Sequence, residues 1–131
     1  MLDPHFAEVY AELSKLSDGV LGTLSSDESE RRRVATFIHD RDPAVTWFYD
    51  HDTGERRLLF RAYPRLDPAD LAPMTAVHFP ARDGLPLHAF LTLPVDVEPR
   101  DLPMVLLVHG GPWTHDTWGY SPQAQFLANR G

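Results

Sequence analysis

An uninterrupted apolar run, Met104–Val108, leads directly into the sequence His-Gly-Gly-Pro-Trp at positions 109–113, and this junction constrains the chain most. A continuous apolar run, as opposed to an alternating one, is typical of a strand buried on both faces of a parallel sheet. The two glycines and the proline that follow predict an abrupt turn out of that strand. The sequence therefore predicts an α/β arrangement in which strand 104–108 holds a rigid loop at its end.

The loop 109–113 has the composition needed to bind a negatively charged oxygen. Acyl transfer passes through a tetrahedral oxyanion, and fixed backbone N–H groups stabilise it with little reorganisation. Glycine permits close approach to such a backbone. We therefore expect the N–H groups of Gly110 and Gly111 to act as oxyanion donors, with His109 and Pro112 positioning the loop. An ordinary strand-to-loop turn is the alternative, because Gly-Gly-Pro is common at turns.

Aromatic and metal-ligating residues follow the same loop. Trp113, Trp118 and Tyr120 are candidates for the wall of a substrate pocket, and packing against a sheet is the alternative for them. His115 and Asp116, together with the loop histidine, form a possible metal-ligand set. Metal sites usually take their ligands from elements that fix the geometry, which a glycine-rich loop does not. We therefore predict no metal and no cofactor.

The first half of the chain predicts one helix and three antiparallel strands. Residues 5–16 have apolar side chains at helical spacing, with Asp3 as a possible N-cap. Three short runs rich in β-branched and aromatic residues predict strands at 34–39, 45–50 and 57–60.

The segments between these strands are polar. The segment 50–55, with Asp50 and Asp52, is interpreted as an aspartate-capped turn; a calcium loop is the alternative, but the ligand spacing is wrong for one. Residues 25–31 are expected to form a loop, and Arg31–Arg33 a solvated charged edge.

A proline-rich stretch at 63–73 divides the chain into two units, 1–70 and 71–131. In the second unit, runs at 75–79 and 87–93 flank Asp83-Gly84 and predict a β-hairpin. In that hairpin His78 and His88 are expected to be cross-strand neighbours. Residues 121–131 predict a helix with serine at the N-cap and proline at the first helical position.

Composition narrows the classes of function. The chain has 131 residues, a net charge of −7 and no cysteine. An acidic surface disfavours nucleic acid and anionic membranes as partners, and the lack of cysteine excludes disulfides and thiolate chemistry. With no apparent signal sequence or membrane-spanning run, the expected location is cytoplasmic.

The stretch 74–131 resembles the start of the catalytic domain of the prolyl oligopeptidase family of serine peptidases, closest to its acylaminoacyl-peptidase-like branch. The matching segments are residues 81–85, 91–94, 105–113 and 126–131. The resemblance implies that 1–70 is the end of a β-propeller-like domain with a short N-terminal helix. It also implies that 71–131 is the N-terminal part of an α/β-hydrolase domain.

The resemblance further implies that the parent protein hydrolyses peptide bonds of short peptides through an acyl-enzyme. The family's catalytic Ser, Asp and His follow the His-Gly-Gly-Pro loop and have no counterpart here; no Gly-x-Ser-x-Gly occurs in the chain. We therefore expect a fragment that is inactive alone and that needs a peptide substrate and the rest of the hydrolase domain, C-terminal to Gly131, as partners. An esterase or lipase of the same fold and a non-catalytic binding module are the alternatives.

Overall fold

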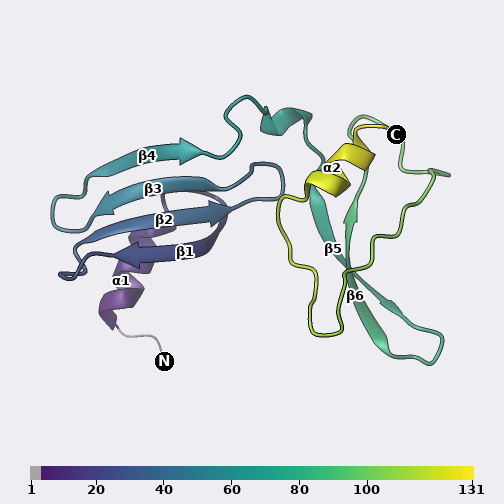
Figure 1. Ribbon diagram of the computed structural model, residues 1–131, viewed down its shortest axis with the longest axis horizontal. Coiled ribbons are helices and arrows are strands. Elements are labelled where there is room, and N and C mark those ends of the chain that lie inside the picture. Colours follow the sequence, from purple (N-terminus) through teal and green to yellow (C-terminus); the bar gives the residue numbers. More distant parts are fainter. Residues whose placement is uncertain (1–3) are drawn as a thin grey trace.

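The computed structural model describes residues 4–131 and shows two lobes joined by an extended link (Figure 1). The first lobe, residues 4–61, contains α1 (Pro4–Leu13), β1 (Val20–Ser26), β2 (Arg32–Ile38), β3 (Val45–Asp50) and β4 (Arg56–Arg61). The link carries one short 3₁₀ helix, η1 (Pro68–Asp70), and the second lobe contains β5 (Met74–Pro80), β6 (Pro86–Thr92) and α2 (Pro122–Ala128). No helix of the described residues is both long and apolar enough to cross a membrane.

The first lobe is an antiparallel meander with strand order β1-β2-β3-β4. Its last three strands confirm the strands predicted at 34–39, 45–50 and 57–60. Strand β1 was not predicted, because Gly22, Thr23 and two serines interrupt its apolar pattern. A four-stranded antiparallel meander is compatible with the propeller-like strands expected for this half.

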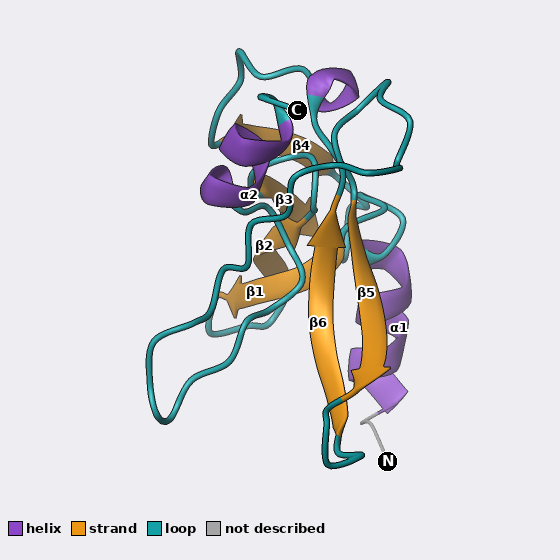
Figure 2. Cartoon of the chain, turned by 90° about the vertical axis from the view of Figure 1, so that its right-hand side faces the viewer, coloured by secondary structure: helices purple, strands orange, loops and turns teal. Residues whose placement is uncertain are grey.

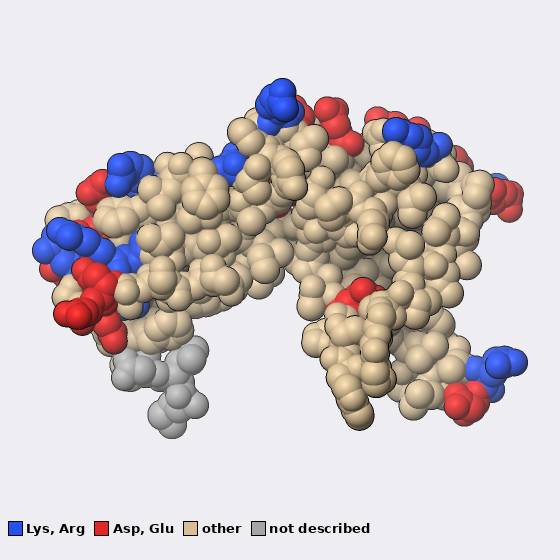
Figure 3. Space-filling view, viewed as in Figure 1, with Lys and Arg blue, Asp and Glu red and all other residues tan. Residues whose placement is uncertain are grey.

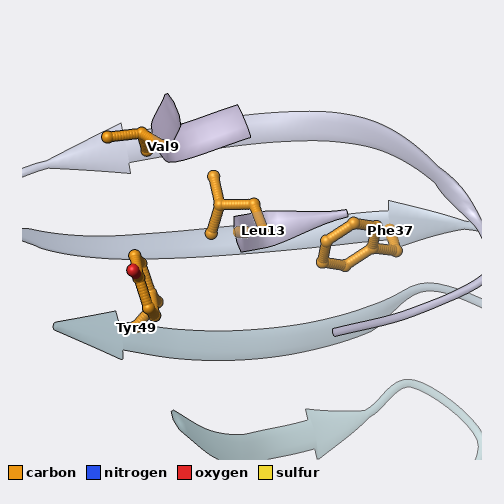
Figure 4. Close-up of a cluster of buried hydrophobic side chains, with 5 residues drawn as sticks. Val9, Leu13, Phe37 and Tyr49 are labelled. Carbon is orange, nitrogen blue, oxygen red and sulfur yellow. The ribbon is translucent and has the colours of Figure 1, made fainter. Parts of the chain in front are cut away.

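The core of the first lobe lies between α1 and one face of the sheet. Val9 and Leu13 of α1 are fully buried against Phe37 and Tyr49, as Figure 4 shows. The predicted amphipathic helix is thereby confirmed, and the capping role expected of Asp3 lies outside the described residues. Burying each of these large apolar side chains stabilises the folded state by about 1.5–3 kcal/mol, and this burial holds α1 on the sheet.

The expectation of a solvated charged edge at Arg31–Arg33 is wrong for its last member. Arg33 lies on the buried face of β2, where buried and less buried residues alternate, and it stands opposite Tyr49. Its guanidinium Nη2 lies 3.6 Å from a carboxylate oxygen of Glu30. Successive side chains of a strand point to opposite faces of the sheet, so every second residue of β2 faces the core. Arg33 occupies one of these positions and is buried although it is charged.

The second lobe begins with the predicted β5–β6 hairpin, whose two strands run next to each other in Figure 2. Its turn is closed by hydrogen bonds from Ala81 N to Leu85 O (2.8 Å) and from Gly84 N to Ala81 O (2.9 Å). Gly84 has φ +86°, a conformation that glycine adopts without strain. His78 and His88 stand directly opposite each other with ring centroids 4.5 Å apart, as the sequence predicted.

Helix α2 is also confirmed, with Ser121 as its N-cap and Pro122 at its first position. The Ser121 hydroxyl oxygen accepts a hydrogen bond from the N–H of Ala124 at 3.3 Å. Between β6 and α2 the chain runs through a long connection that projects away from the sheets in both views (Figures 1 and 2).

The predicted buried strand at 104–108 is wrong for this structure. Residues 104–108 form no strand, and all five side chains are at least half exposed. A strand needs a neighbour to satisfy its backbone groups, and among the described residues none pairs with this segment. The described chain is therefore mostly antiparallel strands with few helices, and the start of an α/β-hydrolase domain stays a prediction.

Candidate functional site

The loop 109–113 is exposed along its whole length. The His109 ring Nδ1 donates a hydrogen bond to the Gly110 carbonyl oxygen at 2.6 Å, which holds the imidazole against its own loop. The Gly111–Pro112 peptide bond is cis, and Trp113 is 95% exposed. The positioning role expected of His109 and Pro112 stays a prediction.

The two backbone donors expected in this loop are the N–H groups of Gly110 and Gly111. Among the described residues, neither the N–H of Gly110 nor that of Gly111 donates a hydrogen bond to another protein group. A Cβ built on Gly110 would meet nothing within 4 Å, so the space beside its backbone is open. Two free, adjacent N–H groups can receive an anionic oxygen, but their effect is weak until water is excluded.

Trp118 and Tyr120 lie where the two lobes meet, unlike the exposed Trp113. The Trp118 Nε1 donates a hydrogen bond to the Met74 carbonyl oxygen at 2.9 Å. The Tyr120 ring lies 6.3 Å from the ring of Tyr63 in the link. Both side chains therefore pack at the junction, and the pocket role expected of the three aromatic residues stays a prediction.

Two hollows of the described structure lie away from the loop. One, of about 140 Å³, lies between the link, residues 94–97 and α2, and is lined in part by Ala72 and Gln125. Its volume is below the roughly 300 Å³ of ordinary ligand pockets. Another, of about 420 Å³, is lined by the consecutive link residues 62–66. Neither is lined by loop residues 109–113, so these two hollows supply no binding cleft for the loop.

Sequence reasoning missed a buried glutamine on α2. Gln125 is 7% exposed; its Oε1 accepts from the N–H of Ala72 at 2.9 Å, and its Nε2 donates to the carbonyl oxygen of Ala72 at 2.7 Å. The same Nε2 reaches the carbonyl oxygen of Asp40 at 3.3 Å. No pattern in the sequence marks this residue, because glutamine is usually exposed.

A serine, a histidine and an aspartate also meet at the end of β2. The Ser17 Oγ lies 2.9 Å from His39 Nε2, and His39 Nδ1 lies 3.4 Å from a carboxylate oxygen of Asp18. Asp18 is 98% exposed, and the Ser17 Oγ accepts a hydrogen bond from the N–H of Gly19 at 3.4 Å. A hydrolytic triad needs a buried, orienting carboxylate and separate oxyanion donors. These three residues do not meet those requirements, and their contacts connect the turn between α1 and β1 to the end of β2.

The strongest electrostatic centre lies at the turn between β3 and β4. Arg31 Nε contacts both carboxylate oxygens of Asp50 at 3.0 Å, and this contact holds the pKa of Asp50 well below its ordinary value. The same carboxylate accepts from the N–H groups of Asp52 and Thr53, which confirms the aspartate-capped turn. No group of three or more metal-ligating side chains occurs among the described residues. Figure 3 shows both signs of charge gathered at this end of the first lobe.

Comparison with known proteins finds two curated relatives of the chain. No family model matches it. The homologues found are dipeptidyl peptidases by name. Dipeptidyl aminopeptidase BIII of Pseudoxanthomonas mexicana is 31% identical over 138 aligned residues, which cover 100% of this chain and 20% of that protein. Dipeptidyl peptidase family member 6 of Caenorhabditis elegans is 28% identical over 119 residues, covering 75% of this chain and 16% of that protein. The chain thus spans a fifth or less of the length of these curated relatives.

Proposed function

We propose that this chain is part of a serine-type peptidase of the prolyl oligopeptidase family that releases dipeptides from the N-termini of short peptides. The observation that carries the proposal is the alignment of the whole chain with a dipeptidyl aminopeptidase at 31% identity. The names of both relatives favour dipeptide release over the acylaminoacyl-peptidase-like branch that the resemblance suggests.

In this proposal the chain supplies the end of a propeller-like domain and the first segments of the hydrolase domain. The free N–H groups of Gly110 and Gly111 bind the oxyanion that forms when a serine attacks the scissile carbonyl. The nucleophile, its histidine base and the orienting carboxylate come from the protein C-terminal to Gly131. Those same segments cover residues 104–108 and exclude water from the loop, which strengthens both hydrogen bonds to the oxyanion.

The reaction is tested in the longer protein that carries this chain. A fluorogenic substrate with a free N-terminal dipeptide should be cleaved, and a fluorophosphonate should label one serine. Cleavage of simple esters but not of the dipeptide substrate would favour an esterase. A folded protein without labelling would favour a binding module, and either result would overturn the proposal.

The donor role of the loop is tested by a pair of substitutions at Gly110. Gly110→Pro removes the N–H, and we expect kcat to fall by about 10²–10³, the usual effect of losing one oxyanion donor. Gly110→Ala is the matched control, because it keeps the N–H and its Cβ has open space in this structure. Equal activity in the two variants would show that this N–H does not act in catalysis.

A further inference from the structure

The two lobes are joined by a link that cannot fix their orientation by itself. Residues 62–73 contain three prolines, and their only regular element is the short η1. Among the described residues, Ala72 is the only fully buried apolar side chain outside the first lobe. The junction therefore lacks a closed apolar core, and its aromatic contacts are only partly buried, so directional polar contacts are needed to define it.

Those polar contacts converge on Gln125 and Asp40. The Gln125 side-chain amide pairs with both backbone groups of Ala72 and also reaches the Asp40 carbonyl oxygen on the loop between β2 and β3. The Asp40 carboxylate accepts from the N–H of Met74 at 2.9 Å. One amide and one carboxylate thus hold four segments together: the β2–β3 loop of the first lobe, the link, β5 and α2.

The end of the long loop is attached to the same place. Trp118 donates to the Met74 carbonyl oxygen, so both backbone groups of Met74 are engaged. A Cβ on the next residue, Gly119, would lie 2.9 Å from Cγ2 of Ile38 at the end of β2, so the loop here packs closely against the first lobe. The connection that carries residues 109–113 is therefore anchored at its C-terminal end to the junction.

We propose that Gln125 and Asp40 form a hydrogen-bonded lock that fixes the second lobe on the first. The physical basis is directional bonding. Without the Gln125 side-chain amide, the buried N–H and C=O of Ala72 have no hydrogen-bond partner. Separation of the lobes then becomes more favourable in free energy, because it lets water bind these two groups. The lock operates in this chain whatever reaction the longer protein carries out.

The lock is tested by the distance between spin labels on the two lobes. The chain has no cysteine, so Glu28→Cys in the β1–β2 turn and Arg82→Cys in the β5–β6 turn give unique attachment points. Pulsed electron spin resonance should give one narrow distance distribution. Gln125→Met has nearly the same volume but makes no amide hydrogen bonds, and it should broaden that distribution while circular dichroism stays unchanged. Gln123→Met, on an exposed position of the same helix, should leave it narrow.

Amide exchange provides an independent readout. The N–H of Ala72 should exchange faster in Gln125→Met by on the order of tenfold, as expected for the loss of one buried hydrogen bond. If that variant unfolds α2, Asp40→Ala carries the test, because it removes the acceptor for Met74 and keeps the carbonyl that Gln125 uses. A narrow distribution in both lock variants, or a broad one in the unaltered chain, would overturn the lock. Neither result bears on the peptidase proposal.

Discussion

The two lobes use their apolar residues in opposite ways. In the first lobe, Phe37 is 1% exposed and packs with Val9 and Leu13 between a helix and a sheet. In the second lobe, Leu106 is 74% exposed, and the only buried residue of α2 is the polar Gln125. The first lobe thus has a closed core, although its edge strand β4 is exposed, and the second lobe presents an open apolar surface.

The difference follows from how far apart in the sequence the segments are that must pack or pair in each lobe. Strands of an antiparallel meander pair with their sequence neighbours, so the first lobe closes within 4–61. A buried strand of a parallel sheet pairs only across long connections, and residues 104–108 have no such neighbour among the described residues. The first lobe is therefore expected to hold most of the stability of this chain.

The largest expected effect is on the core of the first lobe. Phe37→Ala should lower the free energy of unfolding by about 3–5 kcal/mol, because a large buried ring leaves a cavity. Phe90→Ala, at a side chain on β6 that is 36% exposed, should cost less than about 1 kcal/mol. Urea titrations followed by circular dichroism measure both. Similar losses in the two variants would contradict the contrast between a closed and an open lobe.

A smaller, pH-dependent effect is expected at Asp50. The Arg31 guanidinium lowers the pKa of this carboxyl in the folded chain, so Asp50 contributes stability above its unfolded pKa of about 3.9. That contribution is lost as the pH falls from there toward the lowered folded-state pKa. Asp50→Asn should therefore be less stable than the unaltered chain at neutral pH, and the difference should shrink in acid.

Asp52→Asn serves as the control for this electrostatic prediction. Asp52 is 62% exposed and lies 3.4 Å from Arg31 Nε, so solvent screens its interaction and its loss should matter less. Urea titrations at neutral and acidic pH measure both variants. A difference for Asp50→Asn that does not change with pH would show that the turn hydrogen bonds, and not the charge, stabilise this end of the lobe.

The smallest effect on unfolding is expected in the open surface. Leu106→Glu should change the free energy of unfolding by no more than about 0.5 kcal/mol, because the side chain buries little in this chain. It should nevertheless reduce self-association, since a contiguous exposed apolar run promotes it. Val20→Glu, at an exposed position outside the run, is the control. Light scattering over a range of concentrations would reveal the change, and equal association in all three proteins would contradict it.

Local signals predicted much of this fold. Short runs rich in β-branched and aromatic residues located β2–β4, Asp83-Gly84 located the β5–β6 hairpin, and Ser121-Pro122 located the start of α2. Each of these signals acts through neighbours in the sequence, so the chain need not be folded for it to be recognised. The strand β1 was not predicted because its apolar pattern is weak. The burial of Arg33 was not predicted because a charged side chain is usually exposed.

The sequence by itself determined where the β5–β6 hairpin, the Asp50 turn and the start of α2 fall, and it placed two glycines in a loop after an apolar run. Only the tertiary structure decided that this run stays open, that Trp118 and Tyr120 pack at the junction, and that Gln125 is buried there. The physical reason is that turns and caps depend on contacts a few residues apart. Burial and strand pairing depend on segments far away in the sequence, because these segments supply the apolar surface and the backbone groups that a residue packs against or pairs with.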